Sequence, residues 1–293
     1  MDIERCTLAC PDSPTTSLPH HLTISPSGSH LTRSFSFNRS GGPPGGEVMI
    51  GLAQSRIVTS RDGIQFTTTS TVGKQWRSCV WNSQLNVFVV VGQGGYGDNI
   101  MTSPDGFTWT VSQNQPPNFQ IAGPWKGVTY GGGKFVAVGG SDSSSQPSVA
   151  YSTDGLSWTE VPRASLPIGD WLGVAYGGPP GAELFVAVSQ NGPNDVMTSP
   201  DGVSWTARPS PLDPPIRSVA WGNGAFMAVI SGESLSGGPR GMVSSDGITW
   251  VPVNDPVLDA GVWMSVIYAE GHFVGVGYGR GGSYAKNTAF YTT

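Results

Sequence analysis

One seven-residue phrase, Ser-x-Asp-Gly-x-x-aromatic, recurs five times in this chain of 293 residues. The copies begin at Ser60, Ser103, Ser152, Ser199 and Ser244, so their spacings are 43, 49, 47 and 45 residues. Self-similarity at a period of this size is the mark of stacked supersecondary units. The chain is therefore built from one small unit that repeats along its length.

A second phrase precedes the first in the repeat unit: a cation or large apolar residue, then Ser or Gly, then two further residues, and then an aromatic. It occurs six times, beginning at Arg33, Arg77, Lys126, Leu172, Arg217 and Met264. An apolar run such as Phe135 to Gly139 follows each copy, with Glu47 to Gly51 as a weaker first one. Short β-branched and aromatic runs bounded by Gly, Asn and Asp indicate strands, and no window keeps a helical period. Each unit therefore reads as four short antiparallel strands.

Four strands per unit and six units predict an all-β fold, a six-bladed β-propeller of four-stranded antiparallel blades. Residues 21–293 form the propeller in this interpretation, and residues 1–20 are an N-terminal tail. The last unit ends at Thr293, before a box and a fourth strand. We expect the N-terminal strand His21 to Ser25 to complete that blade, because closure removes exposed sheet edges.

The repeated aspartates are predicted to be turn residues. Asp-Gly between two strands is a strong hairpin signal, because Gly accepts positive φ and the carboxylate can bind backbone N–H groups. Five equivalent acids spread around a ring also do not converge on one substrate. The Trp that ends the phrase is expected to cover the seam between neighbouring blades. The aspartates interpreted in this way are Asp62, Asp105, Asp154, Asp201 and Asp246.

Composition and charge argue against several classes of partner. The formal net charge is −5 and the 15 basic residues form no run, which disfavours a nucleic-acid surface. No apolar stretch approaches the ~20 residues that cross a bilayer, so membrane insertion is not expected. The polar, acidic start is unlike a Sec-type signal peptide. No cofactor motif stands out, and the four histidines and three cysteines do not form a metal-ligand pattern.

The repeated phrase resembles the Asp-box, or bacterial neuraminidase repeat, Ser-x-Asp-x-Gly-x-x-Trp, shortened here by one residue. The whole unit, from Trp125 to Gly139 and on to Trp158, is similar to propeller repeats of bacterial secreted proteins and of phage and large-virus proteins. The resemblance covers nearly everything after residue 30. It implies the propeller fold, and it is compatible with sialidases, carbohydrate-binding modules and structural proteins.

The residues do not support an enzyme. A sialidase-like site would require an arginine triad and an early Arg-Ile-Pro motif, and the chain has only the reverse order, Pro215-Ile216-Arg217. A glycosidase requires two carboxylates roughly 5–10 Å apart, whereas the acids outside the boxes are scattered one or two per unit. Glycoside hydrolase is the only enzyme class that stays plausible.

Recognition is expected on one face of the ring. The loops that join strands two and three and those between blades are long and divergent, and rigid scaffolds place binding residues on such loops. Four cations open inner strands toward that face, and together they would attract an anionic group. Those cations are Arg33, Arg77, Lys126 and Arg217, and the candidate loop contacts are Tyr96, Phe119, Arg163, Asp170, Arg208, Arg240, Tyr278, Arg280 and Tyr284.

We therefore expect a non-enzymatic structural or recognition component of a virion, phage particle or bacterial surface, with a protein in an assembly or a cell-surface receptor or glycan as partner. Localisation at a virion or extracellular surface is expected, with the cytoplasm as alternative. The alternative function is a carbohydrate-active propeller, either lectin or sialidase-like hydrolase. Cys6 and Cys10 in the tail are candidates for a disulfide or an intersubunit contact, whereas Cys79 sits at a strand position filled elsewhere by Val or Phe.

Overall fold

The computed structural model describes most of the repeat region. The described residues are 35–36, 48–62, 64–94, 99–112, 125–140, 147–191, 194–212, 215–231, 238–259, 261–269, 271–279 and 287–291. They contain 21 strands, a 3-10 helix (η1, Arg163–Ser165) and a single-turn α-helix (α1, Pro256–Asp259). Every strand pairing among these residues is antiparallel, as expected for repeats joined by short turns.

The strands form five sheets, each ordered along the sequence. The first contains β1 (Phe35–Ser36), β2 (Met49–Ser60), β3 (Thr67–Asn82), β4 (Val87–Gln93), β5 (Ile100–Ser103) and β6 (Thr110–Val111). The second contains β7 (Trp125–Gly131), β8 (Lys134–Gly140), β9 (Pro147–Ser152) and β10 (Thr159–Glu160). The third contains β11 (Trp171–Gly177), β12 (Leu184–Ser189), β13 (Val196–Ser199) and β14 (Thr206–Arg208).

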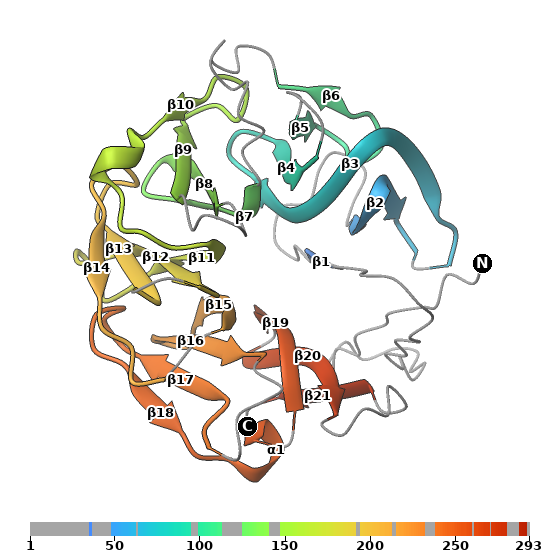
Figure 1. Ribbon diagram of the computed structural model, residues 1–293. Helices are drawn as coiled ribbons and strands as arrows, with labels where there is room; N and C mark the ends of the chain where they lie inside the picture. Colours follow the sequence, from blue (N-terminus) through green and yellow to red (C-terminus); the bar gives the residue numbers. More distant parts are fainter. Residues whose placement is uncertain are drawn as a thin grey trace.

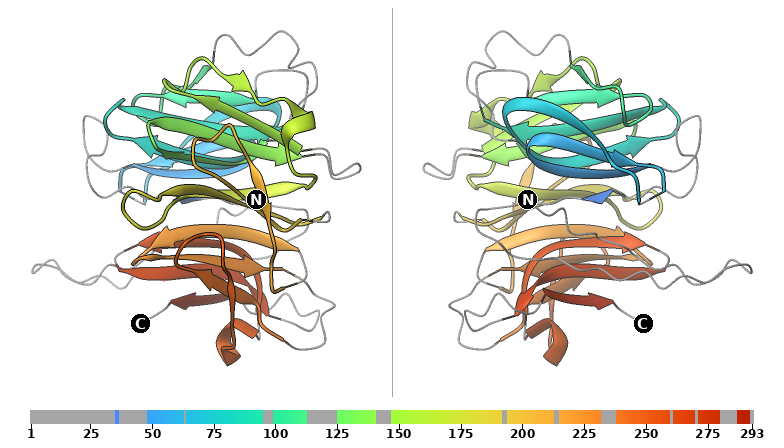
Figure 2. Two further views of the ribbon diagram at one scale, coloured as in Figure 1. Left: turned by 90° about the vertical axis from the view of Figure 1, so that its left-hand side faces the viewer. Right: turned by 90° about the vertical axis from the view of Figure 1, so that its right-hand side faces the viewer.

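The last two sheets follow the same order. The fourth contains β15 (Ile216–Gly222), β16 (Ala225–Ile230), β17 (Gly241–Ser244) and β18 (Val251–Val253). The fifth contains β19 (Gly261–Ala269), β20 (His272–Gly279) and β21 (Asn287–Tyr291). Successive sheets lie around a common centre, with β7, β11, β15 and β19 innermost and β10, β14 and β18 at the rim (Figure 1). In the side views the strands cross the molecule, so their connecting turns gather at two opposite faces (Figure 2).

The hydrophobic core is divided among the seams between neighbouring sheets. In one seam Val136 and Val138 of β8 pack against Trp171 and Phe185 of the next sheet, and the box residue Trp205 covers the cluster. Equivalent clusters fill the seams between the first and second, third and fourth, and fourth and fifth sheets, and a further cluster lies within the first sheet. Alternation along the strands produces this arrangement, because each strand sends side chains to both faces of its sheet.

The first repeat unit differs from the expectation of a separate blade. β2 and β3 each run through two of the segments expected as individual strands, so the first and second units share one sheet. The connections within them, residues 52–55 and 71–74, are short and contain no proline. Five sheets are therefore found where six blades were expected, and the proposed closing strand at residues 21–25 lies outside the described part of the chain.

The first unit nevertheless packs on the following unit in the same way as the later units do. A Cβ placed on the box glycine Gly106 would lie 2.8 Å from Val48, just as one on Gly155 would lie 2.9 Å from Val89 and one on Gly202 would lie 2.6 Å from Val136. Val48 thus takes the place of Val89 and Val136, the second residue of the apolar run.

Candidate functional site

Every innermost strand carries a register shift at the same point. Its pairing with the following strand slips by one residue, which is a β-bulge. Bulges turn a side chain away from the regular alternation and are common beside functional sites. The bulged residues, which we call the bulge ring, are Arg77, Lys126, Leu172, Arg217 and Met264.

The small residue after each bulge allows neighbouring inner strands to approach closely. A Cβ on Gly127 would lie 3.0 Å from the backbone oxygen of Leu172. Where the residue is serine it bridges the strands: Ser78 Oγ accepts a hydrogen bond from Val128 N at 3.3 Å, and Ser218 Oγ accepts one from Val266 N at 3.1 Å. Each member of the bulge ring is thereby placed by backbone contacts rather than by its own side chain.

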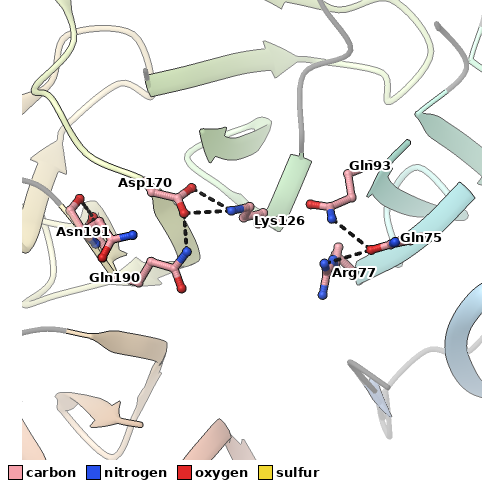
Figure 3. A network of polar contacts seen from close by, with 8 residues as sticks. Gln75, Arg77, Gln93, Lys126, Asp170, Gln190 and Asn191 are labelled. Atoms are coloured by element: carbon pink, nitrogen blue, oxygen red, sulfur yellow. Dashed lines mark hydrogen bonds and ion pairs between the residues drawn. The ribbon is translucent and has the colours of Figure 1, made fainter. Parts of the chain in front are cut away.

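The Lys126 ammonium forms an ion pair with Asp170 of the next unit. Its Nζ lies 2.8 Å from both Asp170 carboxylate oxygens, and the exposed fractions of the two side chains are 7 % and 0 %. The Gln190 amide also donates to this carboxylate (Figure 3). The backbone N–H of Asp170 donates to Asn191 O at 3.0 Å. The ion pair therefore links the second and third sheets and is almost entirely removed from water.

Two arginines of the ring are held by neutral side chains. Arg77 Nη2 donates to Gln75 Oε1 at 3.0 Å, and Gln93 Nε2 donates to the same oxygen at 2.9 Å (Figure 3). Arg217 Nε donates to Ser231 Oγ at 2.7 Å. The apolar members are Leu172, which is half-buried, and Met264, whose side chain is 40 % exposed. One backbone geometry thus presents cationic, ion-paired and apolar side chains, an arrangement suited to selective contact.

Other predicted contact residues lie apart from the ring. Arg163 begins η1, with Nε 3.6 Å from Glu160 Oε1, and Arg208 is on the rim strand β14, where Nε donates to Thr198 Oγ1 at 2.9 Å. Tyr278 belongs to β20. Arg240 was expected to be an exposed contact, and this is wrong: its exposed fraction is 0 %, and its backbone N–H donates to Asp259 Oδ1 of α1.

Some predicted residues lie outside the described part of the chain: Arg33, Tyr96, Phe119, Arg280, Tyr284, Cys6 and Cys10. Cys79, in contrast, is buried in the seam where a small apolar residue was expected. The sequence interpretation considered only the cations at the ring position and missed Leu172 and Met264 as functional neighbours. The alignment of the repeats contained the signal that would have identified them.

The box turns show what the repeated aspartates do. Asp105 Oδ1 accepts hydrogen bonds from Phe107 N at 2.8 Å and Thr108 N at 2.7 Å, and Ser103 Oγ accepts one from Gly106 N at 2.7 Å. The Trp109 indole N–H donates to Gly106 O at 2.8 Å. The boxes at Asp154, Asp201 and Asp246 repeat these contacts.

Hydrogen bonding also fixes the ionisation of the box acids. At Asp105, Asp154, Asp201 and Asp246 partial burial acts to raise the pKa, but the backbone and serine hydrogen bonds outweigh it and the pKa is lowered. At Asp62 the hydrogen bonds from Gln65 N and Ile64 N are the main cause of the lowered pKa. The carboxylates are therefore stabilised in the ionised form that caps the turn.

Replacing Asp154 by alanine is expected to lower the free energy of unfolding by about 0.5–2 kcal/mol, by analogy with the loss of a helix cap. Since the folded-state pKa is lowered, this stabilisation is present above about pH 4, the usual Asp range, and is lost as the pH falls through the folded pKa. Urea denaturation from pH 7 to pH 3 measures both. A difference between wild type and Asp154→Ala that grows on acidification would contradict the capping role.

The described residues give no sign of metal chemistry or of a helical membrane anchor. Among them, no three His, Cys, Asp or Glu side chains gather closely enough to hold a metal ion. A search of the same residues for a helix long and apolar enough to cross a bilayer finds none.

Comparison with solved structures identifies the fold. One chain of the crystal structure of a nidogen/laminin complex matches with a TM-score of 0.55 and 11 % identity, over 83 % of this chain and 92 % of that one. An ancestral GH74 enzyme matches with a TM-score of 0.59 and 13 % identity over 91 % of this chain, which spans only 38 % of the enzyme chain. No protein-family model matches, and no curated protein matches significantly. Both structural neighbours are β-propeller proteins, so at these identities the likeness shows one thing: this chain has a β-propeller fold.

Proposed function

We propose that this protein is a non-enzymatic binding or structural component that recognises a protein or receptor partner through the bulge ring. The observation that supports this most strongly is the mixture of side chains on one repeated backbone position. Arg77, Leu172, Arg217 and Met264 differ in charge and polarity although the same bulge places them all. The backbone does not require this divergence, and binding residues commonly lie at positions that a rigid scaffold leaves free to vary.

The proposed setting is a virion, phage particle or bacterial surface, and it rests on the likeness of the repeats to Asp-box propeller units. One structural neighbour comes from a nidogen/laminin complex, so protein recognition is compatible with this fold. We also propose six blades, with residues 21–25 completing the last. Two features favour this. The fifth sheet has three described strands, one fewer than each of the three sheets before it. Val48 also packs at the box glycine of the following unit, as Val89 and Val136 of later units do.

A carbohydrate-active propeller is the second candidate, and the GH74 neighbour keeps it under consideration. Such an enzyme requires two carboxylates roughly 5–10 Å apart on either side of a glycosidic bond. Asp170, the carboxylate beside the bulge ring, is fully buried in its ion pair with Lys126. That arrangement favours a structural role for Asp170 over one in acid–base chemistry.

The test compares two double variants that change the net charge equally. Arg77→Gln with Arg217→Gln alters the bulge ring, and Gln84→Glu with Ser245→Glu alters exposed turns on the opposite face. Immobilised wild-type protein is used to capture partners from an extract of the source organism, and capture is quantified by mass spectrometry for each variant.

We expect the ring variant to capture the specific partner roughly tenfold less well, a change of about 1.4 kcal/mol, with a weaker dependence on salt. The turn variant should behave like wild type. If the ring variant captures the partner as well as wild type does, the bulge ring is not the binding site. Binding of the wild type to members of a glycan array, with no protein captured selectively, would favour the carbohydrate-active alternative.

A further inference from the structure

Two large apolar side chains recur in the seams between units, and the unit that follows along the chain supplies both. The first stands immediately before the bulged residue of the inner strand and is fully buried: Trp76, Trp125, Trp171, Ile216 or Trp263. The second is the aromatic that ends the box, and in four seams it packs with the core cluster: Trp109, Trp158, Trp205 or Trp250. Each indole N–H of these boxes donates to the carbonyl oxygen of its own box glycine at 2.8–3.2 Å.

The first unit has a smaller residue at both of these positions. Thr32 stands immediately before Arg33 in the sequence, and the first box ends in Phe66. The Phe66 side chain is 40 % exposed. The equivalent side chains of three later boxes are 3 %, 8 % and 7 % exposed: Trp158, Trp205 and Trp250. Phenylalanine also lacks the N–H that tryptophan donates to the box carbonyl. The first unit therefore has less apolar area to remove from water at these two positions, and hydrophobic stabilisation is roughly proportional to that area.

The packing of the other seams indicates which junction these two residues belong to. Trp171 and Trp205 pack on the sheet before them, against Val138 of β8, and the same arrangement recurs in three other seams. Phe66 is therefore expected to face the unit that precedes the first one around the common centre. That unit is the fifth sheet, because β2 and the fifth sheet lie at the two ends of the arc of sheets (Figure 1). On its other side the first unit is held by β3, which continues into the second unit while it is paired with β2.

We propose that the junction between the first box and the fifth sheet opens as a local step while the other seams stay closed. Proteins open locally where the fewest apolar contacts hold the structure, and the residue types at positions 32 and 66 give this junction less apolar area than the other seams have. Among the described strands β21 pairs with β20 alone, so opening would leave the other edge of β21 accessible to a further strand. The proposal rests on the suggested closure of the ring, but it is independent of any partner bound at the bulge ring.

Hydrogen–deuterium exchange of the full chain, followed by mass spectrometry, measures how often each region opens. Peptides that contain the first box (residues 57–70) and β21 report on the junction, and a peptide with the box of the third sheet (residues 196–208) is the reference. We expect the two junction peptides to exchange at least about tenfold faster than the reference after correction for intrinsic rates, because they open without global unfolding. Equal protection of all three peptides would overturn the proposal.

Two matched variants test whether the aromatic of the first box controls this opening. Phe66→Trp supplies the larger ring and the N–H, and Trp205→Phe makes the reverse change in the third sheet. We expect Phe66→Trp to slow exchange of both junction peptides by about tenfold and to leave the reference unchanged, since it adds buried apolar area only at the junction. Trp205→Phe should speed exchange of the reference peptide alone. If Phe66→Trp slows exchange at residues 57–70 but not in β21, Phe66 stabilises only its own turn and the proposal is wrong.

A deletion of residues 1–28 distinguishes this proposal from that of the closing strand. If residues 21–25 complete the last sheet, the deletion removes the protection of β21, and Phe66→Trp does not restore it. If β21 keeps its protection in the deletion variant, residues 21–25 are not the closing strand. A common response of β21 and residues 57–70 to Phe66→Trp would still support the junction in that case, and circular dichroism verifies that each variant is folded.

Discussion

Replacing Lys126 by methionine is expected to lower the free energy of unfolding by about 3–5 kcal/mol, the range for breaking a buried ion pair. Lys126 Nζ is 2.8 Å from both carboxylate oxygens of Asp170, whose side chain is fully buried. Removal of the ammonium takes away the charge that faces this buried carboxylate, and the neutral Gln190 amide does not replace it. Chemical denaturation of wild type and Lys126→Met at pH 7 measures the difference.

Two further variants separate the ion pair from the loss of a long side chain. Lys134→Met removes a lysine from an exposed contact and should cost at most about 1 kcal/mol. Adding Asp170→Asn to Lys126→Met removes the buried carboxylate charge that has lost its ion pair, so the double variant should be more stable than Lys126→Met alone. A loss below about 1 kcal/mol for Lys126→Met would show that the pair contributes no more than a surface ion pair does.

Replacing Gly222 by alanine is expected to cost about 1–3 kcal/mol or more, as overpacking in a dense core does. Its Cβ would lie 1.9 Å from the Tyr268 ring of the following sheet, where no side chain fits. Tyr268 in turn makes an edge-to-face contact with Phe273 of its own sheet, with ring centroids 5.1 Å apart. The Tyr268 ring would have to leave this contact, so thermal unfolding should occur at a clearly lower temperature.

A double-mutant cycle checks that the clash is the cause. Tyr268→Ala is destabilising by itself because it removes a large side chain from the seam. In that background Gly222→Ala should cost little, since nothing then occupies the space of the new methyl group. Additive costs in the double variant would mean that the glycine is required for its backbone and not for the space above it. The same geometry recurs at Gly131 beneath Tyr176 and at Gly177 beneath Trp221.

The sequence predicted best the elements that depend on residues close together in the chain. The strand and turn positions of the second to fifth units follow from alternation and from the Asp-Gly signal, and the tryptophans of the boxes lie in the seams. The continuous pairing of the first and second units in one sheet was not predicted. The connections at residues 52–55 and 71–74 allow strand pairing to continue into the next unit, and this depends on tertiary pairing rather than on local preference.

The candidate site was predictable only in part for a similar reason. The repeat alignment located Arg77, Lys126 and Arg217. It did not predict that each lies at a register shift of one residue, because the residue types there do not indicate a bulge. The partner of Lys126 lies 44 residues away in the next unit, and only the ring arrangement brings the two together. Arg240 is charged and lies in a loop, so the sequence predicts an exposed side chain, whereas the residue is fully buried and its backbone N–H donates to Asp259 Oδ1 of α1.

Because of the bulge, the side chain of one residue on each of these inner strands can vary while the pairing of the strand stays the same. Residues on either side of it have fixed tasks: Trp125 fills a seam and Gly127 admits the neighbouring strand. The residue between them has been Arg, Lys, Leu or Met without any change in the backbone that carries it. Each duplication of the unit thus adds one position whose side chain the strand pairing does not prescribe, and it becomes fixed only where a neighbouring blade builds on it, as Asp170 does on Lys126.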